Sequence, residues 1–279
     1  MADQPDTQRL PDDDSRGDER PKGDGKSMPF LEHLEELRRR LLKCAVAVLV
    51  TTSAAFYFSD ELVRLIQIPL AGIPLYNTEV AGTFYAYLKI SIMTGIFTAI
   101  PFIFYQMWVF ISPGLYKRER HAVLPLVLFS TLLFLVGAAF CYLAVLPLAT
   151  SYLLGFADEQ IANLVTVGSY ISYVGLMMLA FGLTFQLPIL AYFLGKVGVV
   201  RAATLARARR YAIVGIAIIA AIFTPPDVVS QLLLGVPMYL LYEVSIVVVY
   251  FVQRKRLRRE AEDEAAEERR LPYSRLDER

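Results

Sequence analysis

The chain has 279 residues, of which 56% are hydrophobic, and its mean hydropathy is +0.45. These values are above those of soluble proteins, and the apolar residues come in long blocks, which indicates a membrane protein. The formal net charge of +1 argues against a surface that binds nucleic acid.

The N-terminal segment, residues 1–27, is acidic, rich in Pro and Gly, and has no apolar stretch. It lacks the features of a signal peptide or a transit peptide. We therefore expect a disordered cytoplasmic tail.

The next segment joins a charged helix directly to an apolar one. One stripe at helical spacing consists of Phe30, Leu34, Leu37 and Leu41. The remaining surface carries Glu32, Glu35, Glu36, Arg39 and Arg40. From Leu41 to Phe58 the chain is almost wholly apolar and long enough to enter and cross a bilayer. The segment thus places carboxylates and arginines at a membrane boundary, where we expect recognition to occur.

Apolar segments recur along the chain without an intervening hydrophilic domain. The six are 41–58, 88–111, 123–146, 170–194, 211–223 and 228–252. In lipid, runs of this length satisfy their backbone hydrogen bonds as helices. The predicted fold is therefore an all-α polytopic membrane protein, a bundle of six transmembrane helices over 28–252 with the last two short. Residues 253–279 are expected to form a charged cytoplasmic tail.

The distribution of Lys and Arg predicts the orientation of the bundle. Basic residues crowd alternate ends of the spans, at 38–43, 117–120, 196–210 and 254–259. In the opposite loops the charged residues are mainly acidic, with Arg64 and Lys89 as the exceptions. Because cytoplasmic loops carry the excess of Lys and Arg, both termini are expected to be cytoplasmic.

The fifth segment, 211–223, is short for a span. Its 13 residues make roughly 20 Å of helix, whereas a hydrocarbon core is roughly 30 Å thick. Either the helix starts earlier, at Arg209 and Arg210, or the bilayer thins locally. Pro225 and Pro226 end this helix, and Asp227 is expected to cap the next one.

Polar side chains within the spans are few, so each is a candidate functional residue. Gln186 either bonds to a neighbouring helix or serves as a docking point for a partner helix that carries its own polar group. Glu243 is expected to be buried and either paired or protonated rather than catalytic.

The histidines and the acidic residues do not form a pattern that is typical of an enzyme. His33 and His121 are the only histidines, and neither has acidic or cysteine partners at the spacing of metal ligands. Glu119 is a lone acid in a basic loop. No nucleophile elbow, zinc-binding helix or phosphate loop is present in the sequence. We expect neither catalysis nor a cofactor.

Four stretches, in order, resemble one family: TatC, the polytopic core of the twin-arginine protein translocase. They read HLEELRRRLL (33–42), FIFYQMWVFISPGLYKRER (102–120), FGLTFQLPI (181–189) and TPPDVVSQ (224–231). The resemblance covers residues 28–252 and includes the predicted topology of six spans with both termini cytoplasmic.

The resemblance implies a receptor in the bacterial cytoplasmic (inner) membrane that binds signal peptides with consecutive arginines and exports folded proteins. It also implies single-span TatA and TatB partners, assembly with further copies of itself, and use of the proton-motive force.

The same resemblance assigns roles to individual residues. The recognition carboxylates fall on Glu36 and Glu119. Nearby functional positions fall on Arg38, Phe110, Lys117 and Arg120. Further functional positions fall on Pro69 and Asp227. Gln186 stands where many relatives carry Glu, and a partner-binding edge is implied at Ala221 and Ile222.

Elementary chemistry supports the two carboxylates. Arg presents a planar fork that a carboxylate binds bidentately, and Lys cannot reproduce it. The alternative for Glu36 is an ordinary helix pair with Arg40, while Glu35 is expected to be a solvated charge.

Two other classes of function fit the sequence less well. A small-solute secondary transporter usually shows internal repeats and several polar groups at mid-membrane, and this sequence shows no convincing repeat. An intramembrane enzyme lacks a convergent nucleophile and base.

Overall fold

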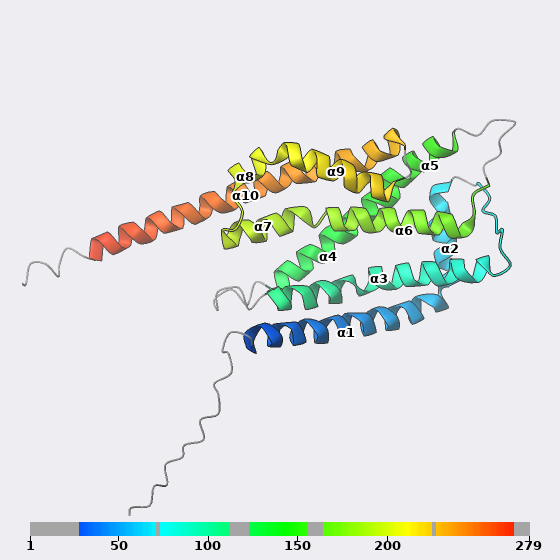
Figure 1. Cartoon of the computed structure of the whole chain (residues 1–279), viewed down its shortest axis with the longest axis horizontal. Coiled ribbons are helices and arrows are strands. Elements are labelled where there is room, and N and C mark those ends of the chain that lie inside the picture. Colours follow the sequence, from blue (N-terminus) through cyan, green and yellow to red (C-terminus); the bar gives the residue numbers. More distant parts are fainter. Residues whose placement is uncertain (1–27, 71–72, 112–122, 156–163, 225–226, 271–279) are drawn as a thin grey trace, which may run out of the picture. The chain divides into compact units, whose positions relative to one another are not determined.

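The computed structural model describes residues 28–70, 73–111, 123–155, 164–224 and 227–270. Within these ranges the regular secondary structure is helical, apart from an isolated bridge between Tyr76 and Thr166, which confirms the all-α class. The elements are α1 (Met28–Tyr57), α2 (Ser59–Gln67), η1 (Ile68–Leu70), α3 (Gly82–Ile111), α4 (Val123–Phe140), η4 (Cys141–Val145), α5 (Leu146–Leu154), α6 (Val167–Thr184), α7 (Leu187–Val197), α8 (Ala202–Arg207), α9 (Arg209–Phe223) and α10 (Val228–Arg270) (Figure 1).

In the described part of the chain, five helical stretches are long and apolar enough to cross a membrane. They are Glu32–Tyr57, Gly82–Ile111, Leu124–Leu154, Val167–Val197 and Val228–Ala266. α9 has 15 residues and is not among them. The chain is therefore an all-α polytopic membrane protein with five long apolar helices.

The expectation that the last helix is also short is wrong. α10 has 43 residues and continues past the apolar segment to Arg270 (Figure 1). The reason lies in the composition of the charged segment, since after Pro237 no Pro or Gly interrupts it. Its Ala, Glu and Arg residues are strong helix formers.

The chain divides into two compact units at the boundary between Arg39 and Arg40, within α1. Of the first unit, the structure describes the charged turns of α1 from Met28 to Arg39. The second unit contains the rest of α1 and every other helix.

Within the second unit, α1 and α3 approach each other closely where small residues face each other. The Thr51 hydroxyl donates to the Gly95 carbonyl oxygen at 2.8 Å. A Cβ added at Gly95 would lie 2.7 Å from the backbone nitrogen and Cα of Thr52, so only glycine fits this approach.

Two clusters of buried side chains form the interior of the second unit. One joins α2, η1, α3, η4, α5, α6 and α9 with α10, and its fully buried members include Leu146, Val174 and Phe181. The other joins α3, α4 and α7 through Phe104, Phe134 and Ile189, among other residues. Many further large apolar side chains are exposed, as expected for surfaces that face lipid.

Both central spans are interrupted rather than straight. Between α4 and α5 the helix widens into the π-helical turn η4, which is followed by Pro147. α6 ends at Thr184, and α7 starts at Leu187 with Pro188 in its first turn. Proline lacks the backbone N–H that a continuous helix needs, which accounts for the break before Pro188.

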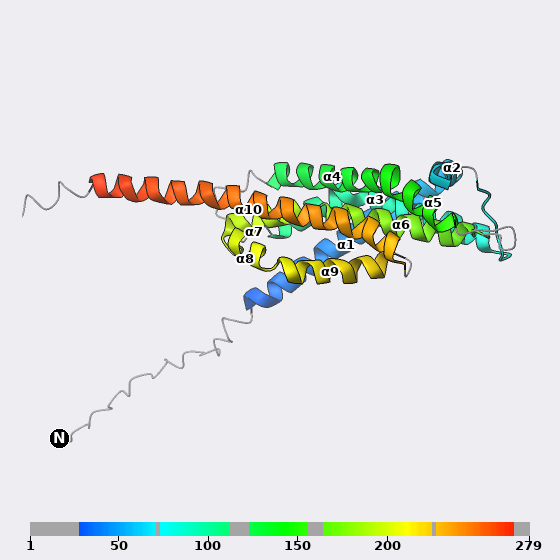
Figure 2. The ribbon, with the colours of Figure 1, turned by 90° about the horizontal axis from the view of Figure 1, so that it is seen from above.

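α9 and α10 form a hairpin, with the two helices packed along each other (Figures 1 and 2). α9 starts at Arg209, so the earlier start, one of the two alternatives for this short segment, is confirmed. At the turn, Asp227 caps α10 as predicted: the Ser230 N–H donates to Asp227 Oδ1 at 2.7 Å.

Candidate functional site: a charged helix end, a polar crossing with a cavity, and an exposed helix edge

The charged turns of α1 present their three acids unequally. Glu32 and Glu35 are exposed, whereas Glu36 is half-buried. Glu35 pairs with Arg39 at 3.8 Å, and both side chains are about two-thirds exposed, as expected for a solvated helix charge. Arg38 is exposed. Glu36 is thus distinguished from its neighbours by burial.

On the other unit, the guanidinium of Arg40 is engaged within the bundle. Its Nη1 donates to Gln106 Oε1 at 3.2 Å, and Gln106 is a buried side chain of α3. Phe110 is half-buried in the last turn of α3. Glu119, Lys117 and Arg120 lie outside the described residues, so their roles stay predictions.

A buried polar network joins three helices at the level of Gln186. The Trp108 indole Nε1 donates to the Ser130 hydroxyl at 2.8 Å, and Gln186 Nε2 donates to the Ser130 carbonyl oxygen at 3.0 Å. Ser130 is fully buried and Trp108 is 3% exposed. The structure therefore gives Gln186 a hydrogen bond to a neighbouring helix, the first of its two expected arrangements.

Sequence reasoning missed Trp108 and Ser130. A weak indication was present, since Trp108 is the only tryptophan and Ser130 belongs to a polar pair inside an apolar run. Their 22-residue separation gives no helical periodicity that would link them.

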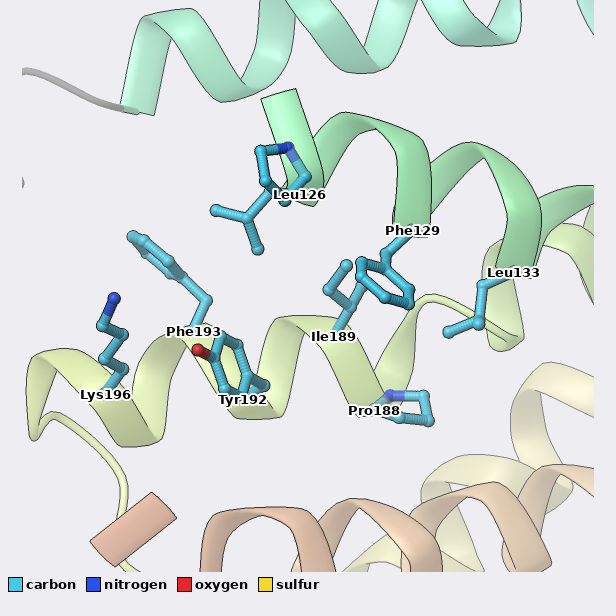
Figure 3. A pocket seen from close by; sticks show the side chains of 9 residues that line it. Leu126, Phe129, Leu133, Pro188, Ile189, Tyr192, Phe193 and Lys196 are labelled. Atoms are coloured by element: carbon cyan, nitrogen blue, oxygen red, sulfur yellow. The ribbon is translucent and has the colours of Figure 1, made fainter. Parts of the chain in front are cut away.

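Beside this network, α4 and α7 enclose an apolar cavity of about 410 Å³ (Figure 3). Its lining comprises Pro125, Leu126, Phe129, Leu133, Pro188, Ile189, Tyr192, Phe193 and Lys196. In Figure 3, Lys196 lies at one end of the cavity, and Leu133 and Pro188 lie at the other. The cavity is thus an apolar slot with a cation at one end.

The α9–α10 hairpin is closed by polar contacts opposite the turn. Arg209 Nε and Nη2 donate to the two carboxylate oxygens of Glu243 at 2.8 and 2.9 Å. The Tyr239 hydroxyl donates to Glu243 Oε1 at 2.8 Å. Glu243 is therefore paired, which is one of the two states expected from the sequence. Its side chain is 30% exposed rather than buried, because its partner Arg209 is the first residue of α9 and is itself 48% exposed.

Between the two ends of the hairpin, Gln231 Nε2 donates to the Ala217 carbonyl oxygen at 2.9 Å. The outer surface of α9 is apolar: Ala221 is exposed, and Ile222 is 68% exposed. The predicted partner edge is therefore accessible on this chain.

Pro69 is buried in the short turn η1. Its carbonyl oxygen accepts from the Thr150 hydroxyl of α5 at 3.3 Å. The contact ties the segment that follows α2 to the end of the third long helical stretch, which is a structural position for this residue.

Known proteins resemble the chain over most of its length. The family model described as Sec-independent protein translocase protein (TatC) matches residues 32–237. A Sec-independent protein translocase protein TatC of Halothiobacillus neapolitanus is 45% identical over 85% of this chain and 66% of its own length. Its namesake from Escherichia coli (strain K12) is 38% identical over 79% of this chain and 87% of its own.

The fold has a solved counterpart as well. A crystal structure of the twin-arginine translocase receptor TatC superposes with a TM-score of 0.72 at 39% sequence identity. The match covers 79% of this chain and 99% of that one.

Proposed function

This chain belongs to the TatC family of Sec-independent protein translocase proteins, and from that membership we propose that it is the receptor for signal peptides with consecutive arginines. The observation that carries the proposal is the likeness, at 39% identity, to a protein described as the twin-arginine translocase receptor. In this role the chain binds the signal peptides of folded proteins. These proteins are then exported across the bacterial cytoplasmic membrane, and the proton-motive force drives the export.

We propose Glu36 and Glu119 as the carboxylates that bind the two guanidinium groups. Glu36 is supported by its half-buried position in α1, because partial burial strengthens a charge-assisted hydrogen bond. Such a bond contributes about 1.5–3 kcal/mol, so its loss lowers affinity by roughly 10- to 100-fold. Arg38, Phe110, Lys117 and Arg120 are proposed to complete the peptide-binding surface.

The experiment compares Arg-Arg with Lys-Lys signal peptides on the purified protein in nanodiscs. The wild type is expected to prefer Arg-Arg, and Glu36→Ala and Glu119→Ala are each expected to reduce that preference. Glu35→Ala is the matched control, since this acid is exposed and paired with Arg39. Equal binding of both peptides by the wild type would overturn the proposal.

We propose the orientation that the basic residues predict, with six spans and both termini cytoplasmic. α9 counts as the fifth span, although its 15 residues make only about 22 Å of helix. The local bilayer then thins around the hairpin. With Cys44 and Cys141 replaced by Ser, single cysteines introduced at 200 and at 227 and labelled from either side of the membrane test this arrangement. Labelling of both from the same side would contradict it.

We further propose that the exposed face of α9, with Ala221 and Ile222, binds single-span TatA or TatB, in an assembly with several copies of this chain. Gln186 is proposed to contribute to partner binding from the neighbouring crossing. Ile222→Asp is expected to weaken partner co-purification and leave signal-peptide binding intact. Leu128→Asp, on a comparably exposed residue of α4, is the control, and an equal loss in both variants would refute the assignment.

A further inference from the structure

We propose that the cavity between α4 and α7 holds one acyl chain of an anionic phospholipid, whose phosphate binds at Lys196. None of the residues proposed for the signal-peptide and partner surfaces lines this cavity, although Gln186 is its neighbour in sequence. Under the proposed orientation, the lipid belongs to the cytoplasmic leaflet.

The cavity has the size and shape that such a chain requires. Its volume of about 410 Å³ lies within the range of ligand sites, roughly 300–1,000 Å³. Ile189 is 8% exposed and forms part of the wall, while Phe129, exposed by 60%, stands at the open side. The slot therefore opens laterally toward the membrane rather than inward to the bundle.

The lining excludes a polar solute. Among the nine residues that line the cavity, Lys196 carries the only charge, and the Tyr192 hydroxyl is the only other polar side-chain group. A polar solute would give up its hydration here and find almost no hydrogen-bond partners. An acyl chain has no hydrogen bonds to give up on entry, and it supplies the dispersion contacts that an unfilled slot lacks.

The charge at one end selects the headgroup. Lys196 lies in the last turn of α7, and its four-carbon stem lines the cavity while the ammonium lies at its end (Figure 3). An ammonium offers three N–H donors, which suits a phosphate oxygen.

The charge and the apolar slot contribute differently to lipid binding. Lipid tails are as apolar as the cavity wall, so burial of a chain gives little preference for one lipid over another. Basic pockets between spans on the cytoplasmic side attract anionic headgroups, by about a factor of five for each cation. Lys196 thus sets which lipid binds, and the slot sets where it stays.

The test is native mass spectrometry of the delipidated full-length protein with added phosphatidylglycerol or phosphatidylcholine of identical chains. The wild type is expected to retain one phosphatidylglycerol, with about a fivefold preference over phosphatidylcholine. Lys196→Gln is expected to abolish the preference and Lys196→Arg to keep it. Lys89→Gln, at an edge of another span, is the matched control and is expected to behave as the wild type.

A second pair of variants tests the slot independently of charge. Leu126→Trp fills the cavity and is expected to remove the retained lipid, whereas Leu128→Trp, on an exposed residue of the same helix, is expected to leave it in place. Unchanged thermal unfolding shows that each variant is folded.

Equal retention of the two lipids by the wild type, an equal effect of Lys89→Gln and Lys196→Gln, or undiminished lipid in Leu126→Trp would each overturn the proposal. Signal-peptide binding is measured on the same samples, and its failure bears on the receptor proposal alone.

Discussion

α4 crosses α6 and α7 through side chains that are buried from both sides, whereas α9 lies along α10 with most of its own side chains exposed. At the crossing, Phe134 and Phe181 have no exposed surface. In α9, Ala220 is the only described residue that is fully buried, while Ile218 and Ile222 are more than half exposed.

The two regions are held together by different forces. The crossing depends on close packing, as at Gly137, where a Cβ would lie 2.8 Å from the Phe181 carbonyl oxygen. The hairpin depends on polar contacts at its two ends and at Gln231. Since lipid removes the hydrophobic drive between helices, polar contacts can hold α9 in place while its apolar face stays available to a partner or to lipid.

The largest expected effect is at the crossing. Gly137→Val forces new atoms against the backbone of α6, which cannot yield, and is expected to lower the free energy of unfolding by about 3 kcal/mol. Denaturant unfolding in detergent measures it. Gly215→Val in α9, where a Cβ meets nothing within 4 Å, is the control. Equal losses would show that the two regions are packed alike.

Trp108→Phe tests the polar part of the crossing. The change removes the donor to Ser130, whose hydroxyl is fully buried, and is expected to cost about 2 kcal/mol in the free energy of unfolding. Ser130→Ala in the same chain removes the orphaned hydroxyl. The double variant is therefore expected to lose less than the sum of the single losses, and simple additivity would contradict the contact.

Asp227→Ala tests the turn end of the hairpin. Loss of the cap on α10 is expected to cost about 1 kcal/mol. Asp227→Ser keeps a side-chain acceptor and is expected to recover most of it. Hydrogen exchange of the Ser230 amide gives a local readout, and unchanged protection in Asp227→Ala would argue against the cap.

Gln186→Leu is expected to have the smallest effect, about 0.6 kcal/mol, because it removes one interhelical hydrogen bond from a half-buried side chain. Gln186→Glu is expected to weaken the crossing at high pH, since an ionised carboxylate cannot donate to the Ser130 carbonyl oxygen. Protonation at low pH restores a donor. Unfolding measured at both pH values should separate the two states, and a Gln186→Glu stability that does not change with pH would refute this role.

Features set by the local sequence were predictable. Apolar length gave the long spans, Arg209 marked the start of α9, and Asp227 was recognisable as a cap because an acceptor before an apolar run satisfies the first N–H groups of a helix. The length of α10 was also readable from its composition but was not anticipated.

Features that depend on how helices are placed were not predictable. The π-helical turn at Cys141, the bond between Trp108 and Ser130, and the cavity at Lys196 each require side chains from separate helices or a local change of helical period. The two carboxylate assignments came from the family resemblance, since Glu36 and Glu35 look alike in sequence. Glu119 lies outside the described residues and stays a prediction.

The continuity of α10 has a mechanical consequence. At 1.5 Å per residue its 43 residues make a rod of about 64 Å, and near its start Gln231 donates to the Ala217 carbonyl oxygen of α9. A tilt of about 10° around Val228 moves Arg270 by roughly 11 Å over that length. A tilt that began at the hairpin would therefore move the charged C-terminal turns of the same helix by more than the hairpin itself.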